Sequence, residues 1–368
     1  MKKILSLVLA AAMTLGMCGC GENAGSPAQP ADGGQSAVEK YGSDTLKLFN
    51  WGEYIGEETI PNFEKEYGVK VISDYFDSNE MMYTKLLAGE SYDVIVPSDY
   101  MIERLISEDM LQPIDKSLIP NMENLCDSLK NREYDPDSTY SVPYFWGSVG
   151  LVFNKNNVDR AEIEKKGYEI LRDEKYKGDI YIYDSERDAF MVAFKALGYS
   201  MNTENEDEIN EAFDWLKSVN DTMEPAYVTD EVIDAMVNEN KDIAVVYSGD
   251  AAYILNENEN MDFIMPNEGT NIWSDAMVIP KNAENPKLAH EFMNYILTHD
   301  ASYDNSITVG YSSSNKEVLD ELSGEDGEFY GNAAYIPREG YEKDEIFHDN
   351  EVLKKKLSEL WIKVKATN

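Results

Sequence analysis

Cysteine and histidine are scarce in this sequence, with three of each among 368 residues. Two of the cysteines lie near the N-terminus, so Cys126 is the single cysteine in the remaining chain. One cysteine cannot form an intrachain disulfide, and we therefore expect the fold to depend on its hydrophobic core. So few thiol and imidazole groups give no support to a metal site built on Cys and His, and we predict that the protein uses no cofactor.

Long hydrophobic runs are also missing, apart from a short one at the N-terminus. The apolar residues 4–17 follow two lysines, and this run is too short for a membrane-spanning helix. Such a segment is typical of an export signal, and Cys18 and Cys20 compete as its processing point. The residue before the cleavage point should be small, which Gly19 satisfies and Met17 does not.

The N-terminal pattern resembles a bacterial lipoprotein signal with Cys20 as the lipidated residue. This resemblance implies that the protein is tethered to the outer face of the cytoplasmic membrane, and an ordinary cleaved signal peptide is the alternative. Residues 21–43 are rich in Gly, Ala, Ser, Pro and Gln without apolar periodicity, as expected of a flexible tether. We therefore predict a signal peptide over residues 1–19 and a tether over residues 20–43.

Basic residues are few relative to acidic ones: 32 Lys and Arg stand against 70 Asp and Glu, for a net charge of −38. So acidic a surface repels nucleic acid and anionic lipid headgroups and concentrates cations. We therefore predict no nucleic-acid partner. A need for solubility alone would also explain such a charge. Only the placement of particular carboxylates can therefore distinguish a cation-binding protein from one whose charge serves solubility.

Catalytic motifs are absent as well. The sequence has no G-x-S-x-G elbow, and two of its histidines, His290 and His299, lie in or just after a predicted helix. The acidic stretch 202–211 lacks the glycine and the spacing of a calcium loop. A pair of carboxylates is always found among 70 acids, so it gives little support to a glycosidase. We predict that the protein is not an enzyme, with a secreted carboxylate-dependent hydrolase as an alternative.

The sequence does contain an apolar pattern that alternates between periods of two and about three and a half residues. Alternating strands and helices with short connections indicate an α/β fold with largely parallel sheets. The roughly 325 residues after the tether suffice for two lobes with a cleft between them. Predicted helices span residues 57–67, 77–89, 99–108, 187–197, 206–219, 230–238 and 286–298, and predicted strands span residues 45–48, 69–76, 92–96, 148–153, 179–183, 241–247, 261–265 and 275–279.

Aromatic and acidic residues recur where predicted strands end, which is where ligands bind in α/β sheets. Aromatic faces cover methylene chains and attract cations, and carboxylates supply the charge that a buried ammonium needs. Several acids with several aromatics therefore favour an elongated organic polycation, whereas a sugar would not need so many uncompensated acids. The residues concerned are Trp51, Glu53 and Tyr54 after the first strand, Ser98, Asp99 and Tyr100 after the third, Asp184 to Asp188, Tyr247 to Asp250, and Trp273 with Asp275 beside the last.

From about Thr45 to Trp361 the chain resembles the spermidine/putrescine-binding proteins of polyamine ABC importers, most clearly in "LFNWGEYI", "YDVIVPSDYMIERL", "YSVPYFWGSVGLVFN", "EGTNIWSDAMVIP" and "TVGYSSSN". This resemblance implies a monomer with a two-lobed type II periplasmic-binding fold, which closes on a polyamine and docks on a membrane permease. The lobes would be residues 44–147 plus 274–313 and residues 148–273 plus 314–368, with hinges near residues 146–147, 273–274 and 312–314. Another small cationic or amino-compound solute is the alternative ligand.

The resemblance also implies which residues bind the ligand. Asp188 and Asp275 would neutralise amines and Glu53 would engage one end, while aromatic side chains would enclose the methylenes. The sequence departs from the family where Ser185 replaces an acid, for which Asp184 is a candidate substitute, where Tyr247 replaces a tryptophan, and where His348 falls on an expected glutamine. The full predicted set is Trp51, Glu53, Tyr54, Ser98, Tyr100, Asp184, Ser185, Asp188, Thr229, Tyr247, Trp273, Asp275, Tyr311 and His348.

Two positions bear on the choice of polyamine. Diamine-preferring relatives tend to have a shorter acid at the position of Glu53 and an acid at the position of Thr229. Here the longer acid and the hydroxyl resemble the spermidine branch. We therefore predict that spermidine is preferred and that putrescine is a weaker ligand.

Overall fold

The computed structural model describes residues 35–366. The predicted signal peptide, the candidate lipidation site Cys20 and most of the predicted tether lie outside the described residues. The end of the tether is helical: in α1 (Ala37–Tyr41) the Tyr41 side chain is buried, and its hydroxyl donates a hydrogen bond to Glu291 Oε2 at 3.0 Å. These last residues differ from the flexible tether that their composition predicts, because a buried aromatic holds them to the folded part of the chain.

The strands form one continuous, mixed sheet in the order β2-β1-β3-β9-β4-β7-β5-β6, and β8 and β10 each pair with β4. The pairs of β1 with β2 and β3, and of β5 with β6 and β7, are parallel. The sequence predicts largely parallel sheets, but β4 and β9 run antiparallel to all their neighbours. The strands are β1 (Thr45–Trp51), β2 (Lys70–Phe76), β3 (Val94–Ile95), β4 (Ser141–Asn154), β5 (Ile180–Tyr183), β6 (Ala226–Val228), β7 (Ile243–Tyr247), β8 (Met261–Ile264), β9 (Ile272–Val278) and β10 (Ser312–Ser313).

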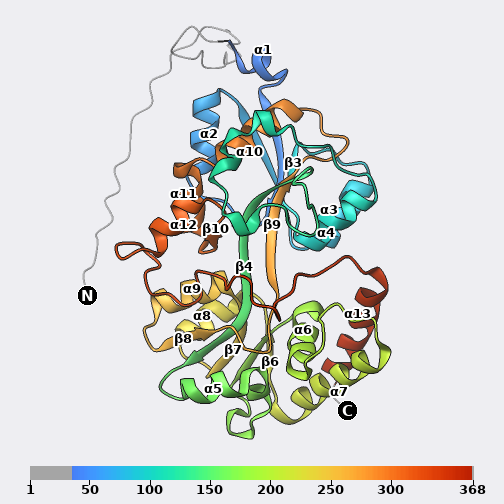
Figure 1. Ribbon diagram of the computed structural model, residues 1–368, viewed down its shortest axis with the longest axis vertical. Helices are drawn as coiled ribbons and strands as arrows, with labels where there is room; N and C mark the ends of the chain where they lie inside the picture. Colours follow the sequence, from blue (N-terminus) through green and yellow to red (C-terminus); the bar gives the residue numbers. More distant parts are fainter. Residues whose placement is uncertain (1–34, 367–368) are drawn as a thin grey trace, which may run out of the picture. The chain divides into compact units, whose positions relative to one another are not determined.

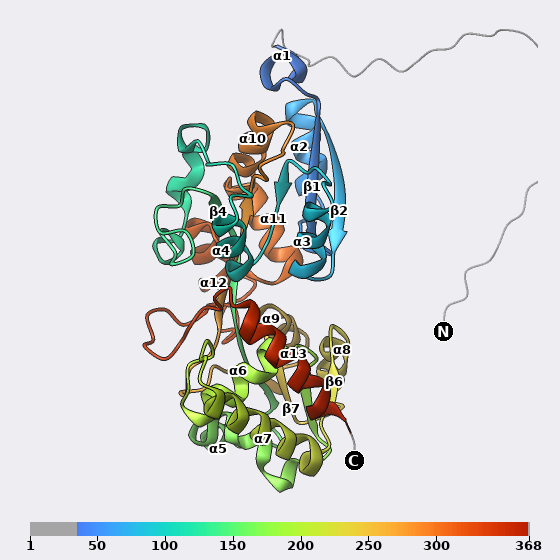
Figure 2. The ribbon, with the colours of Figure 1, turned by 90° about the vertical axis from the view of Figure 1, so that its right-hand side faces the viewer.

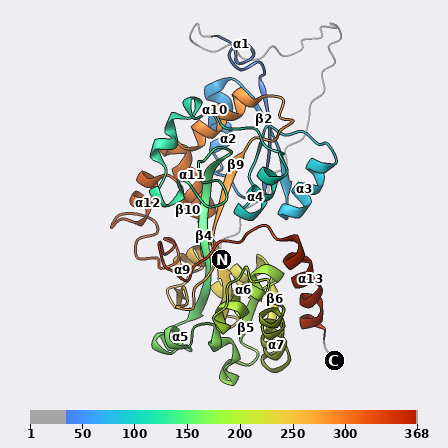
Figure 3. The same ribbon diagram turned by 45° about the vertical axis from the view of Figure 1, so that its right-hand side comes forward.

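Helices cover both faces of the part of the sheet built from β1, β2, β3 and β9 (Figures 1 and 3). On one face, Leu48 packs in a cluster with Phe63 of α2 (Thr59–Tyr67) and Phe292 of α10 (Pro286–Ile296). On the other face, Phe49 packs with residues of α3 (Asn79–Leu87) and α4 (Asp99–Ser107). Consecutive strand residues therefore enter two different cores, as the alternation of side chains along a strand requires.

The second part of the sheet, around β5 and β7, is covered in the same way. One face packs on α6 (Glu186–Leu197), α7 (Glu206–Met223) and α13 (Glu351–Lys365), which lie side by side (Figure 2). The opposite face packs on α8 (Glu231–Val237), α9 (Ser248–Glu257) and α12 (Lys316–Ser323). The remaining helices are α5 (Arg160–Lys166) and α11 (His299–Val309), and single 3₁₀ turns span Lys116–Leu118, Pro120–Asn124, Asp127–Leu129, Gly167–Arg172 and Glu174–Tyr176.

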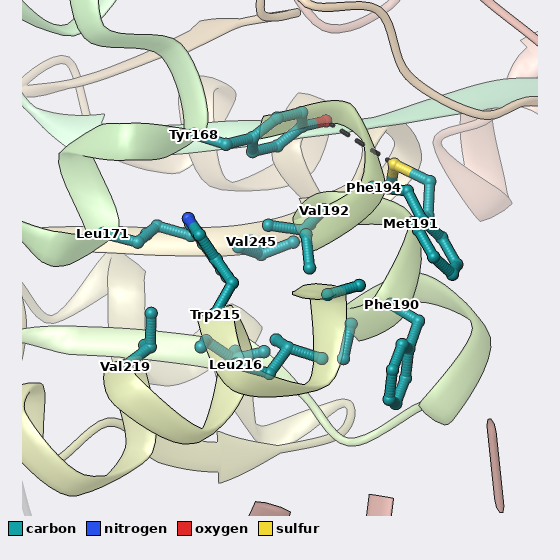
Figure 4. Packing of buried hydrophobic residues seen from close by; sticks show 14 of the residues in the cluster. Tyr168, Leu171, Phe190, Met191, Val192, Phe194, Trp215, Leu216, Val219 and Val245 are labelled. Atoms are coloured by element: carbon teal, nitrogen blue, oxygen red, sulfur yellow. Dashed lines mark hydrogen bonds between the residues drawn. The ribbon is translucent and has the colours of Figure 1, made fainter. Parts of the chain in front are cut away.

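Figure 4 shows the larger core of this second part, in which Phe190 and Phe194 of α6 belong to one cluster of buried side chains with Leu216 and Val219 of α7. α6 is apolar and buried without interruption from Ala189 to Phe194, as expected of a helix that is covered on more than one side. Both ends of α6 are capped. Ser185 accepts a hydrogen bond from the first turn, and Gly198 ends the helix in the left-handed conformation.

Three chain segments cross between the two parts of the sheet at one place. In β4, Trp146 pairs with Ser274 of β9 on one side and with Ser312 of β10 on the other (Figure 1). All fourteen residues of β4 are buried, as expected for a strand with helices on both faces. Gly147 is required here, because a Cβ atom would lie 2.5 Å from the Trp273 ring. The three predicted hinge segments are therefore neighbours in space.

The C-terminal segment is held to α6 by a buried ion pair. Lys195, with 4% of its side chain exposed, places Nζ 2.6 Å from Glu345 Oε2 and 2.7 Å from the carbonyl oxygen of Lys343. Burial raises the pKa of Glu345, but the hydrogen bonds from Lys195, Met201 and Ser200 outweigh it, so the pKa is lowered overall. Removing one partner of such a pair leaves a buried charge uncompensated. The resulting loss of stability is larger than the net stabilisation that the pair itself provides.

Candidate functional site

The first predicted ligand loop follows β1. Trp51 ends the strand, where its Nε1 donates a hydrogen bond to the carbonyl oxygen of Val96 at 2.9 Å and its ring lies 4.5 Å from that of Phe76. Glu53 is exposed and has a φ of 51°, a conformation that residues other than glycine rarely adopt. The structure thus packs Trp51 onto the sheet and leaves the Glu53 carboxylate in solvent.

Tyr54, next in this loop, is joined to Asp275 of β9. Its buried hydroxyl donates a hydrogen bond to Asp275 Oδ2 at 2.8 Å, and the backbone of Asp275 pairs with that of Ser98. Only 6% of Asp275 is exposed, and its other oxygen, Oδ1, has no hydrogen-bond partner among the described residues. Burial, opposed by hydrogen bonds from Ser98 and Tyr54, raises the pKa of Asp275 to about 6.

Asp188 repeats this arrangement on the second part of the sheet. It lies in the first turn of α6, 4% exposed, and its Oδ2 accepts a hydrogen bond from the Tyr247 hydroxyl at 2.6 Å. Its Oδ1 is buried, and no described side chain or backbone group pairs with it. Burial raises the pKa of Asp188, and the hydrogen bonds from Tyr247 and Ser185 oppose this. Asp188 and Asp275 are therefore two buried carboxylates that are each only half satisfied.

A cluster of rings joins the two carboxylates. Trp273 lies at its centre, with ring centroids 6.3 Å from Tyr247 and 5.0 Å from Tyr311, and the Tyr311 ring lies 5.8 Å from that of Tyr54. Tyr183 extends the cluster, 4.9 Å from Tyr247. We call these five residues, Tyr54, Tyr183, Tyr247, Trp273 and Tyr311, the aromatic cluster.

The aromatic cluster and its carboxylates have a definite chemical preference. Asp188 Oδ1, Asp275 Oδ1 and Trp273 Nε1 are buried polar atoms without a partner in the described part of the chain. A buried polar atom without a partner costs about 1–3 kcal/mol, and more when it is charged. Protonated amines would satisfy both carboxylates and gain from the surrounding ring faces, which attract cations by about 0.5–2 kcal/mol each.

Tyr100 and Ser98 lie beside this cluster and are held by Asn79. Asn79 Nδ2 donates hydrogen bonds to Ser98 Oγ at 3.1 Å and to the Tyr100 hydroxyl at 3.0 Å. The guanidinium carbon of Arg187 lies 3.9 Å from the centre of the Tyr100 ring. One face of Tyr100 therefore already contacts a cation of the chain itself.

His348 lies in a group of charged contacts away from the aromatic cluster. Its Nδ1 is 3.2 Å from Glu103 Oε2, and its Nε2 is 3.7 Å from Glu133 Oε2. Nearby, Lys354 Nζ lies 2.7 Å from Glu80 Oε1. These pairs join the segment that precedes and begins α13 to the region of α3 and α4, so the described partners of His348 are carboxylates of the chain.

Three other predicted residues have partners in the structure as well. Asp184 Oδ1 accepts hydrogen bonds from Trp361 Nε1 at 3.0 Å and from Lys365 Nζ at 2.6 Å, both on α13. Thr229 is exposed, and its hydroxyl donates to Glu231 at 2.7 Å. Ser185 accepts from the backbone of α6, as an N-cap does. The carboxylate of Asp184 is thus engaged by α13, whereas Asp188 is not.

Two acidic residues that sequence reasoning did not assign to the site lie next to it. Asp99 is 1% exposed, and burial together with the charge of Asp275 raises its pKa to about 7, against hydrogen bonds from backbone amides. Asp250 lies in the first turn of α9, where burial and then the charge of Asp230 raise its pKa to about 7, while the Tyr311 hydroxyl opposes them. The sequence contained a signal for both residues, because Asp99 in "SDY" and Asp250 in "SGD" each come shortly after a predicted buried strand.

A metal centre and a membrane-spanning helix are both absent from the residues that the structure describes. Within residues 35–366 we found no group of three His, Cys, Asp or Glu side chains arranged to hold a metal ion. Over the same residues, none of the helices combines the length and apolar character needed to cross a bilayer.

Comparison with known proteins gives one consistent family. Residues 58–330 match the model of the bacterial extracellular solute-binding proteins. The spermidine/putrescine-binding periplasmic protein of Salmonella typhimurium is 32% identical over 316 residues, which cover 84% of this chain and 90% of the relative. A putrescine-binding periplasmic protein of Escherichia coli is 31% identical over 299 residues, covering 76% of this chain and 80% of the relative.

Solved structures agree with these matches. The spermidine/putrescine ABC transporter substrate-binding protein of Streptococcus pneumoniae has a TM-score of 0.76 and 35% identity, covering 88% of this chain and 99% of that one. A lipoprotein of Treponema pallidum with the same coverage has a TM-score of 0.75 and 27% identity. The predicted resemblance and the predicted α/β fold of the two-lobed, type II class are therefore confirmed. The matched proteins are solute-binding proteins of transport rather than enzymes.

Proposed function

This chain belongs to the bacterial extracellular solute-binding proteins, and on that premise we propose that it captures a polyamine outside the cytoplasmic membrane and delivers it to an ABC permease. Its relatives in Salmonella typhimurium and Escherichia coli are named for binding spermidine and putrescine, or putrescine. Within this proposal spermidine is the preferred ligand and putrescine the weaker one.

One observation carries the proposal: the two half-satisfied carboxylates at the edge of the aromatic cluster. Asp188 and Asp275 each use one oxygen to accept a hydrogen bond from a tyrosine hydroxyl, and the other oxygen has no partner among residues 35–366. Keeping such a group ionised is costly, and a protonated amine removes the cost while its methylenes cover the ring faces. A neutral sugar would leave both charges uncompensated, so the geometry favours a ligand with several amines.

The remaining predicted residues have supporting roles in this proposal. Glu53 is exposed one residue before Tyr54, and we assign it to the amine that Asp275 also binds. Trp51 and Tyr100 wall the site, and Ser98 lies beside Asp275, because their backbones pair. We keep Thr229 and His348 as residues that bear on ligand choice rather than on amine binding.

We also propose that the two lobes follow the predicted boundaries and move about the three crossing segments. The side-by-side pairing of Trp146 with Ser274 and Ser312 supports this, because a change in a few backbone dihedrals there reorients both parts together. Such a motion would enclose the ligand without refolding either core.

Membrane attachment through a lipid on Cys20 completes the proposal, and the related lipoprotein of Treponema pallidum supports it. A Cys20→Ser variant expressed in bacteria should appear in the soluble extracytoplasmic fraction, while the natural chain should appear with membranes. Equal membrane fractions for both would refute the anchor and leave the binding proposal intact.

Calorimetric titration with spermidine and putrescine tests the binding function. We expect saturable heat with both and a higher unfolding temperature in their presence, because a ligand that binds only the folded state stabilises it. The proposal would be refuted if the folded protein gave neither binding heat nor a shift in unfolding temperature with either polyamine. A screen of other amines and amino acids would then test the alternative ligand class.

A further inference from the structure

Asp99 is an acid that takes no part in the proposed function, although it lies close to Asp275. It is the first residue of α4 and follows the buried strand β3. Only 1% of it is exposed, so its side chain is shielded from molecules in solution. An acid in the first turn of a helix also stabilises the helix N-terminus, but that role does not account for the contacts described next.

The Asp99 carboxylate joins two backbone segments. Its Oδ1 accepts a hydrogen bond from the amide of Tyr100 at 2.8 Å, and its Oδ2 accepts one from the amide of Ser274 at 3.3 Å. Ser274 lies in β9 between Trp273 and Asp275, on one of the three crossing segments. Asp99 therefore links the loop that carries Tyr100 to the strand that carries Asp275.

Backbone hydrogen bonds fix the same junction. The amide of Ala276 donates to the carbonyl oxygen of Pro97 at 3.1 Å, and the backbone of Ser98 pairs with that of Asp275. Asp99 is the member of this junction that can be charged, and a charged acceptor forms a stronger hydrogen bond than a neutral one. The ionised form of Asp99 should therefore hold the junction more firmly than the protonated form.

Asp99 differs from Asp188 and Asp275 in how its oxygens are used. Each of those two carboxylates has a buried oxygen without a partner among residues 35–366. Both oxygens of Asp99, in contrast, accept a hydrogen bond from a backbone amide. An incoming amine would gain little at Asp99, because its acceptors are already engaged. Its contacts are those of a group that shapes a site rather than of one that meets the ligand.

Titratable and charged groups face Asp99 from each element packed against it. They are Tyr100 on its own helix, Asp275 on β9, and Arg132 and Tyr134 in the segment before β4. Burial and then the charge of Asp275 raise the pKa of Asp99 to about 7, against the backbone hydrogen bonds and the charge of Arg132. At about pH 7, roughly half of the molecules therefore carry a proton on Asp99.

An amine bound to Asp275 would change this balance. Its positive charge would offset the negative charge of Asp275, so the ionised form of Asp99 would be favoured and its proton would leave to solvent. The ionised carboxylate in turn holds the amides of Tyr100 and Ser274 more firmly. Amine binding and ionisation of Asp99 therefore favour each other, as linkage between two equilibria requires.

We propose that Asp99 is a positioning residue of the polyamine site: its carboxylate orders the backbone that carries Tyr100 and Asp275, and it releases a proton to solvent when an amine binds. The inference rests on the proposed polyamine-binding function and adds to it a residue that the ligand does not contact. It makes the affinity for the amine depend on pH through a group that lies outside the binding surface.

Titration of an Asp99→Asn variant with spermidine, in buffers of different ionisation heat, tests the inference. At about pH 8 the variant should bind spermidine about tenfold more weakly, because a nearby unit charge in a partly desolvated site has an effect of this order. The loss should be smaller near about pH 6, where Asp99 of the natural protein is already protonated. At about pH 7 the variant should also release fewer protons on binding than the natural protein.

Asp93→Asn is the matched control. Asp93 is also 1% exposed and directly precedes β3, and its carboxylate accepts hydrogen bonds from the backbone amides of Lys47 at 2.9 Å and Asn285 at 2.8 Å. The substitution therefore removes a carboxylate of the same kind at the other end of β3 from Asp99. It should destabilise the fold but change neither the affinity for spermidine nor the number of protons released.

Arg132→Met tests the same inference if Asp99→Asn fails to fold. The positive charge of Arg132 favours the ionised form of Asp99. Its removal should move the fall in spermidine affinity to higher pH, while the affinity at about pH 9 should stay within about twofold of the natural value. A purely structural effect of the substitution would instead lower the affinity by the same factor at every pH.

The outcomes separate the inference from the function on which it rests. The inference would be overturned if Asp99→Asn released as many protons as the natural protein, if its loss of affinity were the same at about pH 6 and pH 8, or if Arg132→Met left the pH profile in place. Each of these results would leave polyamine binding itself standing. Binding of neither polyamine by the natural protein would instead refute the proposed function, and the inference with it.

Discussion

Replacing Asp275 with asparagine should make the ligand-free protein more stable and its ligand binding weaker. Burial raises the pKa of Asp275 from an ordinary value of 3.8 to about 6. At about 1.4 kcal/mol per pH unit, holding this side chain ionised costs the folded state roughly 3 kcal/mol at about pH 8. Asparagine removes that cost, but its amide leaves a buried group without a partner, which costs about 1–3 kcal/mol. The net gain should lie between about zero and 2 kcal/mol.

The gain should depend on pH in a definite direction. Because the folded-state pKa of Asp275 is raised, the stabilisation from its protonated form is fully present below pH 3.8 and is lost as the pH rises through about 6. The advantage of Asp275→Asn should therefore be greatest near pH 8, and it should diminish towards about pH 4. At roughly 2 °C per kcal/mol for a large domain, the unfolding midpoint at about pH 8 should rise by up to about 4 °C.

Ligand binding should change in the opposite direction. Loss of one charge from a buried, hydrogen-bonded pair costs about 2 kcal/mol or more, which corresponds to at least a thirtyfold weaker affinity for spermidine. The Tyr54 hydroxyl can still donate to the asparagine oxygen, so the aromatic cluster should remain in place.

Thermal unfolding by circular dichroism, with and without spermidine at about pH 8 and pH 5, measures both effects. Asp326→Asn serves as the control, because this aspartate is exposed and should change neither the midpoint nor the ligand-induced shift. A ligand-free Asp275→Asn protein that is less stable than the natural one by more than about 1 kcal/mol would contradict the cost assigned to the buried charge. A full spermidine-induced shift in the variant would remove Asp275 from the site.

Two other predictions concern pH and the buried ion pair. Polyamine affinity should fall between about pH 8 and pH 5, because cation binding requires ionised carboxylates and the pKa values of Asp250 and Asp275 are raised to about 7 and about 6. Titration in buffers of different ionisation heat should detect proton release near neutral pH, and constant affinity without proton release would contradict this. Lys195→Met should lower the free energy of unfolding by about 2–4 kcal/mol, since it leaves Glu345 without its partner, whereas Lys40→Met, at an exposed lysine, should change it by less than about 0.5 kcal/mol. Urea denaturation of the two variants measures both free energies of unfolding. Equal losses in Lys195→Met and Lys40→Met would contradict the stabilisation that we assign to burial of the Lys195 pair.

Much of the fold could be predicted from apolar periodicity. The predicted helices at residues 187–197 and 286–298 correspond closely to α6, which Ser185 and Gly198 cap, and to α10, which has an apolar face and Pro286 in its first turn. The long β4 strand was predicted only in its second half, since Pro143 and Gly147 interrupt the pattern of its first half. Its antiparallel pairing with β9 joins residues more than a hundred positions apart, and local sequence carries no signal for such a partner.

The aromatic cluster could be anticipated because strand ends gather at one edge of a sheet. Tyr247 ends β7 and Trp273 lies near the start of β9, two strands that both pair with β4, and the two ring centroids are 6.3 Å apart. Asp250 was present in the same pattern but not assigned, since an acid in a first helical turn has an ordinary structural explanation. The packing of the Tyr311 ring on this turn depends on the missing side chain of Gly249, which only the folded backbone shows to be necessary.

Asp184 and Asp188 show most directly why sequence position alone does not assign a carboxylate to a site. They are four residues apart and follow the same strand, yet Lys365 and Trp361 of α13 engage Asp184, whereas the hydrogen bonds to Asp188 come from hydroxyl groups. Hydrogen bonds and ion pairs already offset the desolvation cost of a paired carboxylate, so a bound cation stabilises it little further. A half-satisfied carboxylate is stabilised much more by a bound cation. In a chain with net charge −38, the acids suited to bind an amine are therefore those that the chain's own lysines and arginines do not reach.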